Sequence, residues 1–446
     1  MLSINDFPIT WSNRPFLDLG SFTSGAIHIL GIEYAYRNML DSTSTINPVT
    51  TLHPISFRDS LIRETGFFQY GVNDPIELPL ELRTERWKTL CDYLYSYQDL
   101  HSSVQEKVTS LLLSLCFHKA ILKYVPERSN EVTFANFSLA KLSYIRAKAK
   151  LLCQLDIGTE ENLKDFEYIV AQSSSDDQVF LASSIELTIL YAKVFRNIDA
   201  AKHWRKIADK SLDHLVSSLS EFQFKLFKSN FHRAAVFIPL VQGKKKTVIR
   251  EMDICQSLAE ELTRECKNET ERIFAHENLT TVFESRTKEA LWLGDIDLAE
   301  ERAKKMVAME PLYSRYRLQL GEILLKQNKF EEAAKIYRSA TRLGPPGMAI
   351  AWFMAGQCHE RLGEIDIACD CYLASLQMDE LAISAVEKIN KLAPRLGNSM
   401  LTDWSTMRLE QLREQQGGMV SKTKTSYIPE ATSALKLAGE RELSQI

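Results

Sequence analysis

Apolar positions recur at helical spacing along most of the chain after residue 80. Four long segments carry an apolar residue every three or four positions, namely 82–97, 104–124, 134–155 and 160–172. The pattern continues from 178 to 280, and its main break is the basic loop 241–247. The chain is therefore predicted to be mostly helical from about residue 80.

The two ends of the chain differ from this middle part. Six of the 13 prolines and five of the 17 glycines lie within the first 79 residues. This density of helix breakers predicts an irregular N-terminal module over 1–80, with one helix near 24–40. After Gly397, a short helix around 401–415 is expected to cap the last helices. The polar segment 419–446 is expected to be a mobile tail.

A repeat of 34–35 residues runs through residues 280–380. It relates small residues, aromatic residues and prolines in successive units: Gly321 and Gly356, Ala333 and Ala368, Tyr337 and Tyr372, Gly294 and Asn328, Ala299 and Ala333, Pro311 and Pro345. Small residues let two helices of a hairpin approach closely, while the aromatic residue fills the space toward the next hairpin. A proline after the second helix ends it. One hairpin cannot bury its apolar face alone, so neighbouring hairpins must stack.

These residues closely resemble the tetratricopeptide repeat family. Residues 314–347 match its pattern well, and in 349–382 Glu380 replaces the final proline. In 280–313, Thr287 stands at the small position and Ala303 at the aromatic position. A fourth unit ends near 197–208, where Ile198, Ala201 and Ala208 have matching offsets.

The resemblance implies an all-α fold, a right-handed superhelix of helical hairpins. The predicted organisation is the irregular module over 1–80, degenerate hairpins over 81–279, three repeats with a capping helix over 280–397, and a short helix with a tail over 398–446. The fold alone does not fix the function, because helical-repeat solenoids have many functions.

Composition narrows the classes of partner. Apolar residues make up 45% and charged residues 25%, and 54 basic against 58 acidic residues give a net charge of −4. This balance provides no overall field for nucleic acid, so a nucleic-acid partner is not favoured. Lys244, Lys245 and Lys246, with Arg250 nearby, form a local basic patch. Either it is a solvated loop or it contacts phosphate or an acidic partner.

The cysteines and the apolar runs indicate the compartment. Eight cysteines are scattered without a CxxC pair, which predicts buried free thiols in a reducing environment. Cys369 and Cys371 are two residues apart on a helix and do not face each other, so a shared metal is not expected. No signal-peptide pattern opens the chain, and the best apolar run, 111–122, is too short for a membrane span. We expect a cytoplasmic protein without a membrane partner.

Signatures of common catalytic sites are missing from the sequence. The nine histidines form no HExxH motif and no zinc spacing with cysteine, and no phosphate-binding loop, GxGxxG or GxSxG occurs. We therefore predict no cofactor, no metal site and no catalytic residue, and we favour a non-catalytic protein.

The resemblance implies that partners are peptides or extended protein segments, held in a concave groove lined by the first helices. The family's groove positions fall on Lys288, Trp292, Arg315, Glu322, Lys326, Phe353, Gln357 and Arg361. The cations can form charge-assisted hydrogen bonds with carboxylates, and the aromatic residues can supply anchoring area. The family's carboxylate-clamp pattern of Lys and Asn is not reproduced. The alternative is that these residues form ordinary solvated helix faces, whereas Trp352 is expected in the core.

Three functional hypotheses remain open. The leading one is an interaction scaffold or adaptor that binds a peptide or protein segment in the groove. The second is an enzyme or enzyme subunit acting on a peptide-borne substrate, with chemistry supplied by polar and aromatic residues of the module 1–80. The third is a peptide-sensing regulator, for which the first 80 residues offer no convincing helix-turn-helix. The partner and the oligomeric state are left open.

Overall fold

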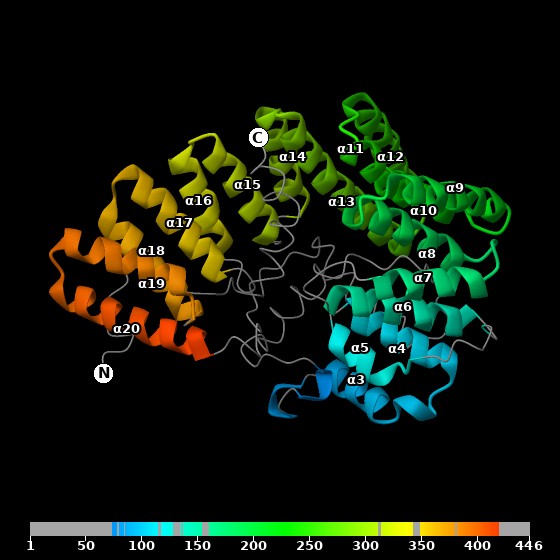
Figure 1. Ribbon diagram of the computed structural model, residues 1–446, viewed down its shortest axis with the longest axis horizontal. Helices are drawn as coiled ribbons and strands as arrows, with labels where there is room; N and C mark the ends of the chain where they lie inside the picture. The colour runs from blue at the N-terminus through cyan, green and yellow to red at the C-terminus, as the bar shows by residue number, and fades with distance from the viewer. Residues whose placement is uncertain are drawn as a thin grey trace. The chain divides into compact units, whose positions relative to one another are not determined.

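The described part of the chain is helical throughout. The computed structural model describes residues 74–77, 80–83, 85–114, 117–127, 134, 137–153, 160–310, 314–341, 348–379 and 381–418, and every regular element in these ranges is a helix (Figure 1). The predicted all-α fold class is confirmed. The predicted helix near 24–40, most of the irregular module and the tail 419–446 lie outside the described residues.

The chain divides into two compact units, and each is described by itself. Among the described residues, those up to Glu289 form one unit and those from Ala290 onward form the other. The described helices of the first are η4 (Pro75–Glu77), η5 (Leu80–Leu82), α3 (Glu85–Tyr95), η6 (Tyr97–Asp99), α4 (Ser102–Ser114), α5 (His118–Tyr124), α6 (Phe137–Cys153), α7 (Glu160–Gln172), α8 (Gln178–Ile189), η7 (Leu190–Val194), α9 (Ile198–Leu215), α10 (Glu221–Ala235), α11 (Phe237–Val241) and α12 (Lys245–Glu265).

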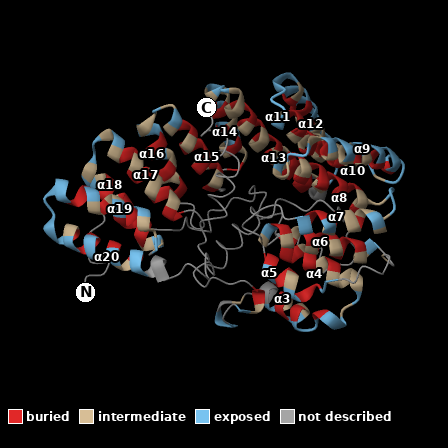
Figure 2. Cartoon of the chain, viewed as in Figure 1, coloured by how far each residue is buried: buried red, intermediate tan, exposed pale blue. Residues whose placement is uncertain are grey.

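The second unit, which we call the repeat unit, begins inside α13 (Glu269–Leu293). It continues with α14 (Ile296–Met309), α15 (Ser314–Lys326), α16 (Phe330–Thr341), α17 (Met348–Leu362), α18 (Ile365–Met378), α19 (Ile383–Leu392), η8 (Ala393–Leu396) and α20 (Ser399–Gly418). Buried positions concentrate where successive helices face one another (Figure 2). Helix α13 runs through residue 280, where the sequence prediction starts the three repeats.

The prediction of one helix over 104–124 is wrong. Helices α4 and α5 occupy this segment, and Phe117 between them has a non-helical backbone with φ −82° and ψ 56°. Leu111, Leu112, Leu113 and Phe117 are all buried. In a single straight helix, these buried apolar side chains would point around most of the circumference. The break instead lets both helices pack against α6.

The hairpin turns share one backbone geometry. Every residue of positive φ in the described ranges stands two positions before a helix: Arg196 (52°), Gly243 (67°), Gly294 (84°), Asn328 (59°), Gly363 (81°) and Gly397 (65°). After each residue but Arg196, the next N–H donates to the carbonyl five residues earlier, as from Lys329 to Leu324 and from Glu364 to His359. This bond closes the preceding helix in a Schellman motif. The turns at Gly294, Asn328, Gly363 and Gly397 share this bond at the repeat spacing and therefore define equivalent positions in successive hairpins.

Glycine brings the two helices of a repeat into close contact. A Cβ on Gly321 would lie 2.6 Å from Cζ of Tyr337, and one on Gly356 would lie 2.7 Å from Cε1 of Tyr372. Both tyrosines are almost completely buried. The small residues thus allow the close approach that the sequence predicts, and each ring packs on the glycine of its own hairpin.

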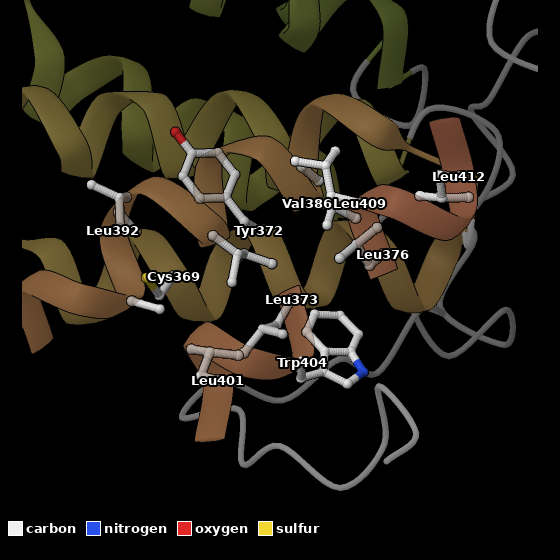
Figure 3. Packing of buried hydrophobic residues seen from close by; sticks show 14 residues of the cluster. Cys369, Tyr372, Leu373, Leu376, Val386, Leu392, Leu401, Trp404, Leu409 and Leu412 are labelled. Atoms are coloured by element: carbon white, nitrogen blue, oxygen red, sulfur yellow. The ribbon is translucent and has the colours of Figure 1, made fainter. Parts of the chain in front are cut away.

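The last three helices of the repeat unit share one core. Tyr372 of α18 lies in a cluster with Val386 of α19 and with Trp404 and Leu412 of α20 (Figure 3). The Trp404 side chain is 5% exposed, so α20 covers the apolar face of α19. The tyrosine therefore also fills space toward the next hairpin, as predicted. Trp352 is 3% exposed and lies in the core, as expected from its position.

Two buried or partly buried charge clusters are notable. In the first unit, Lys141 Nζ of α6 lies 2.7 Å from Glu106 Oε1 of α4, with both side chains no more than 4% exposed. In the repeat unit, Glu300 lies 2.5 Å from Lys304 and 2.6 Å from Lys329. Hydrogen bonds from Lys304 and Lys329 lower the pKa of Glu300 to about 2. The second cluster ties α14 to the turn that precedes α16.

Candidate partner-binding surface

The turns give the candidate residues a structural register. Trp292, Lys326, Arg361 and Arg395 each stand two residues before a left-handed residue, at the end of a first helix. We call these four the end row. Lys288, Glu322, Gln357 and Lys391 stand four residues further upstream, and we call them the upstream row. Successive members of each row are 34 or 35 residues apart.

Two of the predicted cations are already paired within their own helices. Lys326 Nζ lies 2.9 Å from Glu322 Oε1, and both side chains are 37% exposed. Lys288 Nζ lies 2.7 Å from Glu284 Oε1, in the part of α13 that belongs to the first unit. These i,i+4 pairs partly neutralise both lysines, although exposed pairs of this kind are weak and open readily.

The two predicted aromatic anchors differ. Trp292 is half-buried at the start of the repeat unit. Phe353 packs at the edge of the α18–α20 core, with its ring centroid 5.3 Å from that of Tyr372. Phe353 therefore supports the fold as well as offering part of its ring to a partner.

The remaining candidates lie on α15 and α17. Arg315 and Gln357 are half-buried, whereas Arg361 is exposed. Within the described ranges, no carboxylate lies at ion-pair distance from Arg361. Arg361 is therefore the predicted cation with the most freedom to bind a partner.

The sequence reasoning missed two further cations, Lys391 and Arg395. Both are exposed, and no carboxylate among the described residues forms an ion pair with either. Each continues a row by the repeat spacing, since Arg395 stands 34 residues after Arg361. The spacing is the signal that identifies them. The continuation of the row is hard to recognise in the sequence, because Pro394 interrupts the α-helical pattern and the last turn is the 3-10 helix η8.

A direct contact joins the first helices α17 and α19. Lys388 Nζ of α19 lies 2.8 Å from Glu360 Oε2 of α17, which also accepts a hydrogen bond of 2.8 Å from the Tyr372 hydroxyl. Burial alone would raise the pKa of Glu360, but the hydrogen bonds from Lys388 and Tyr372 hold it below its ordinary value. The carboxylate is thus ionised and already engaged.

Charge on the α17–α19 surface is therefore positive. Glu360 is held by Lys388, and Glu387 lies 3.4 Å from Arg413 of α20. Arg361, Lys391 and Arg395 form no ion pair with a carboxylate within the described residues. The surface can accept an anion without displacing an existing ion pair at these three cations.

Other predicted features are placed as follows. Cys369 and Cys371 are buried thiols, as predicted, and burial raises the pKa of both. Lys244 precedes α12, and Lys245 and Lys246 begin it, so the basic loop is shorter than predicted. Among the described residues, no group of acidic, histidine and cysteine side chains could hold a metal ion. The residues of the module 1–80 on which the enzyme hypothesis depends lie outside the described residues.

Comparison with protein families agrees with the register. A family model described as a tetratricopeptide repeat matches residues 288–347 and 318–380. Residues 288–380 therefore carry tetratricopeptide repeats. Such repeats generally bind protein or peptide partners, so the segment is an interaction scaffold of that general kind. No curated protein matches the chain.

Solved structures with similar helical repeats have low sequence identity. MamA is 17% identical with a TM-score of 0.31, covering 40% of this chain and 96% of its own. YrrB, described as a TPR protein with an unusual peptide-binding site, is 16% identical with a TM-score of 0.30, covering 46% and 96%. PH0952 from Pyrococcus horikoshii, a signal-transduction ATPase with a tetratricopeptide repeat sensor, is 11% identical with a TM-score of 0.38, covering 95% and 55%. At these scores the likenesses say nothing about how this chain functions.

None of the helices in the described ranges is both long enough and apolar enough to cross a bilayer.

Proposed function

We propose that the tetratricopeptide repeats hold a peptide, or an extended segment of a protein, along the exposed face of their first helices α15 and α17 and of α19. The chain would then act as an adaptor in the cytoplasm. The free cysteines of the described residues are compatible with that compartment. The observation that carries the proposal is the recurrence, at the repeat spacing, of two exposed cations without a carboxylate partner among the described residues, Arg361 of α17 and Arg395 of η8.

The candidate residues are expected to contribute unequally to partner binding. Arg361 supplies the main charge, because its guanidinium is exposed and can donate two parallel hydrogen bonds to one carboxylate. Lys326 contributes less while it is paired with Glu322. Trp292 supplies aromatic area at the first position of the end row. Phe353 contributes only the part of its ring that the core leaves uncovered.

The candidates Arg315 and Gln357 are assigned secondary contacts, whereas Lys288 belongs to the other unit and is not assigned to this surface. Lys288 is held by Glu284, and the other two side chains are half-buried. Truncation of Arg315 or Gln357 is expected to weaken binding less than truncation of Arg361.

Charge reversal tests this proposal directly. The full chain is used to capture its partner from the source cells, and the affinity of the purified partner is measured by calorimetric titration. Because an exposed ion pair contributes about 0.2–1 kcal/mol and reversal adds repulsion, Lys326→Glu with Arg361→Glu should weaken binding about tenfold.

A matched control separates the surface from general electrostatics. Lys245→Glu with Lys246→Glu makes the same change in net charge on exposed lysines of the other unit. The control should keep the affinity of the unaltered chain. An affinity that survives the reversal of Lys326 and Arg361 would rule out the assigned surface.

A further inference from the structure

We propose that residues 241–250 of the first unit bind the anionic surface of a phospholipid bilayer. We call these residues the basic edge. They comprise the turn between α11 and α12 and the first two turns of α12 (Figure 1). The basic edge lies outside the repeat unit, so this contact is additional to the proposed function. It replaces our expectation of no membrane partner, because a contact at the bilayer surface needs no helix long enough to cross it.

The basic edge carries charge of one sign. It contains four basic residues and no acidic residue, although acidic residues slightly outnumber basic ones in the whole chain. Lys244, Lys245 and Lys246 are exposed, and their side chains form no hydrogen bond or ion pair within the described residues. Arg250 is exposed as well and lies one helical turn after Lys246. The four cations are therefore available to an anionic partner.

The acids that follow in α12 do not neutralise this charge. Glu251 is buried, and its carboxylate lies 2.7 Å from Nη2 of Arg205 in α9 and 2.8 Å from Nδ1 of His232 in α10. The Asp253 carboxylate lies 2.9 Å from the guanidinium of Arg286 in α13. Both carboxylates are thus engaged by other cations.

The stability of α12 does not explain the three lysines. This helix has no acidic residue in its first turn, and no side chain caps its N-terminus. Cations at this end of a helix are unfavourable, because the backbone dipole places partial positive charge there. Helices α8 and α9 instead begin with capping side chains, Asp177 and Asn197, which accept hydrogen bonds from N–H groups of the first turn.

Apolar side chains accompany the cations of the basic edge. Val241 is 38% exposed and Ile249 is 36% exposed. Ile249 stands four residues after Lys245 on α12, so these two side chains share one face of the helix. At a bilayer surface, apolar side chains can enter the boundary between headgroups and acyl chains while lysines remain with the phosphates. The basic edge combines both kinds of side chain.

A nucleic acid fits the basic edge less well. Its phosphates also attract lysine, but its backbone offers no apolar boundary to Val241 and Ile249. No aromatic residue stands within 241–250, whereas proteins that bind single strands use aromatic side chains to stack on bases. The composition of the edge therefore favours a lipid surface over a nucleic acid.

Co-sedimentation of the full chain with phospholipid vesicles tests the proposal. Vesicles of phosphatidylcholine with about a quarter of phosphatidylserine are compared with vesicles of phosphatidylcholine alone at about 0.1 M salt. We expect binding to the anionic vesicles only, and weaker binding when the salt concentration is raised. Each lysine near an anionic surface strengthens binding about fivefold, so Lys245→Glu with Lys246→Glu should weaken binding at least about twenty-five-fold.

Matched variants separate the basic edge from net charge and from folding. Lys164→Glu with Lys267→Glu changes the net charge equally on exposed lysines of the same unit and should keep vesicle binding. Ile249→Ser should weaken binding several-fold at every salt concentration, because it removes apolar area and no charge. Reversal of Lys245 and Lys246 places acids in the first turn of α12, so its helicity and urea midpoint should not fall.

Equal binding to both kinds of vesicle, equal loss in both pairs of reversals, or no binding to either vesicle would overturn the inference. Double-stranded DNA that binds as tightly as the anionic vesicles, and that is lost in the same reversal, would also overturn it. The titration that tests the proposed function contains no vesicles, so the result of each experiment is independent of the other.

Discussion

Replacing Gly356 by alanine places two physical effects in opposition. Alanine is the better helix former by up to about 1 kcal/mol, so propensity alone predicts a more stable protein. The new methyl group, however, would lie 2.7 Å from Cε1 and 2.9 Å from Cδ1 of Tyr372. Carbon atoms in contact prefer about 3.5–4.0 Å, so the ring or the helix must move.

The surroundings of Tyr372 decide which effect is larger. Its ring is fully buried and packs against Phe353, and its hydroxyl donates a hydrogen bond of 2.8 Å to Glu360. Moving the ring would disturb both contacts. Overpacking of a closely packed core costs about 1–3 kcal/mol. We therefore expect Gly356→Ala to lose about 1–2 kcal/mol of stability despite its higher helix propensity.

Urea unfolding followed by circular dichroism measures this loss. A second background provides the control, because Tyr372→Leu removes the ring that the methyl group would meet. In that background Gly356→Ala should be neutral or stabilising, so the sign of its effect should reverse. A Gly356→Ala variant at least as stable as the unaltered chain would refute the assigned contact between glycine and tyrosine.

Three further predictions concern the turns and the charged groups. Gly363→Ala should lower the free energy of unfolding by about 1 kcal/mol, because the φ of 81° at this position strains any residue with a Cβ. Asn328→Gly should keep a free energy of unfolding within about 0.5 kcal/mol of the unaltered chain. Equal urea midpoints for the two variants would contradict this expectation. Lys141→Ala should lower the free energy of unfolding by about 3–5 kcal/mol, because it leaves the Glu106 carboxylate buried without its cation. The double variant Lys141→Met with Glu106→Leu should recover most of this stability. Thermal unfolding that shows no recovery in the double variant would argue against the ion pair as the cause. The pKa of Glu300 is about 2 in the folded chain against 4.5 in the unfolded chain, so its ion pairs add stability above pH 4.5 that is lost as the pH falls toward 2. Glu300→Gln should therefore flatten the dependence of the unfolding free energy on pH between 4.5 and 2. An unchanged slope would show that other acids cause this dependence.

Much of the fold is accessible from sequence because the repeat places distinctive residue types at fixed spacing. Gly321 and Gly356 mark the close approach of two helices, and Tyr337 and Tyr372 mark the rings packed on them. The all-α class and the repeat follow from these positions. The break at Phe117 was less accessible, because buried apolar residues surround it on both sides and periodicity alone cannot separate one helix from two.

The candidate surface was only partly predictable. The positions of Lys326 and Arg361 in the repeat can be recognised from the sequence. The position of Arg395 cannot, because the residues around Pro394 do not follow the repeat pattern. Turn geometry defines the register better than sequence does, because Asn328 adopts the same left-handed conformation as Gly363. The i,i+4 spacing of Glu322 and Lys326 does signal their pairing. The engagement of Glu360 by Lys388 is a contact between two hairpins, which only the structure reveals.

The central claim is that partners bind along the first helices of the repeat unit. Hydrogen–deuterium exchange of the full chain, with and without its captured partner, tests it most directly. The account predicts slower exchange in 314–326, 348–362 and 383–396, with 330–341 and 365–378 unchanged. Protection confined to these second helices, or protection of only the other unit, would contradict it.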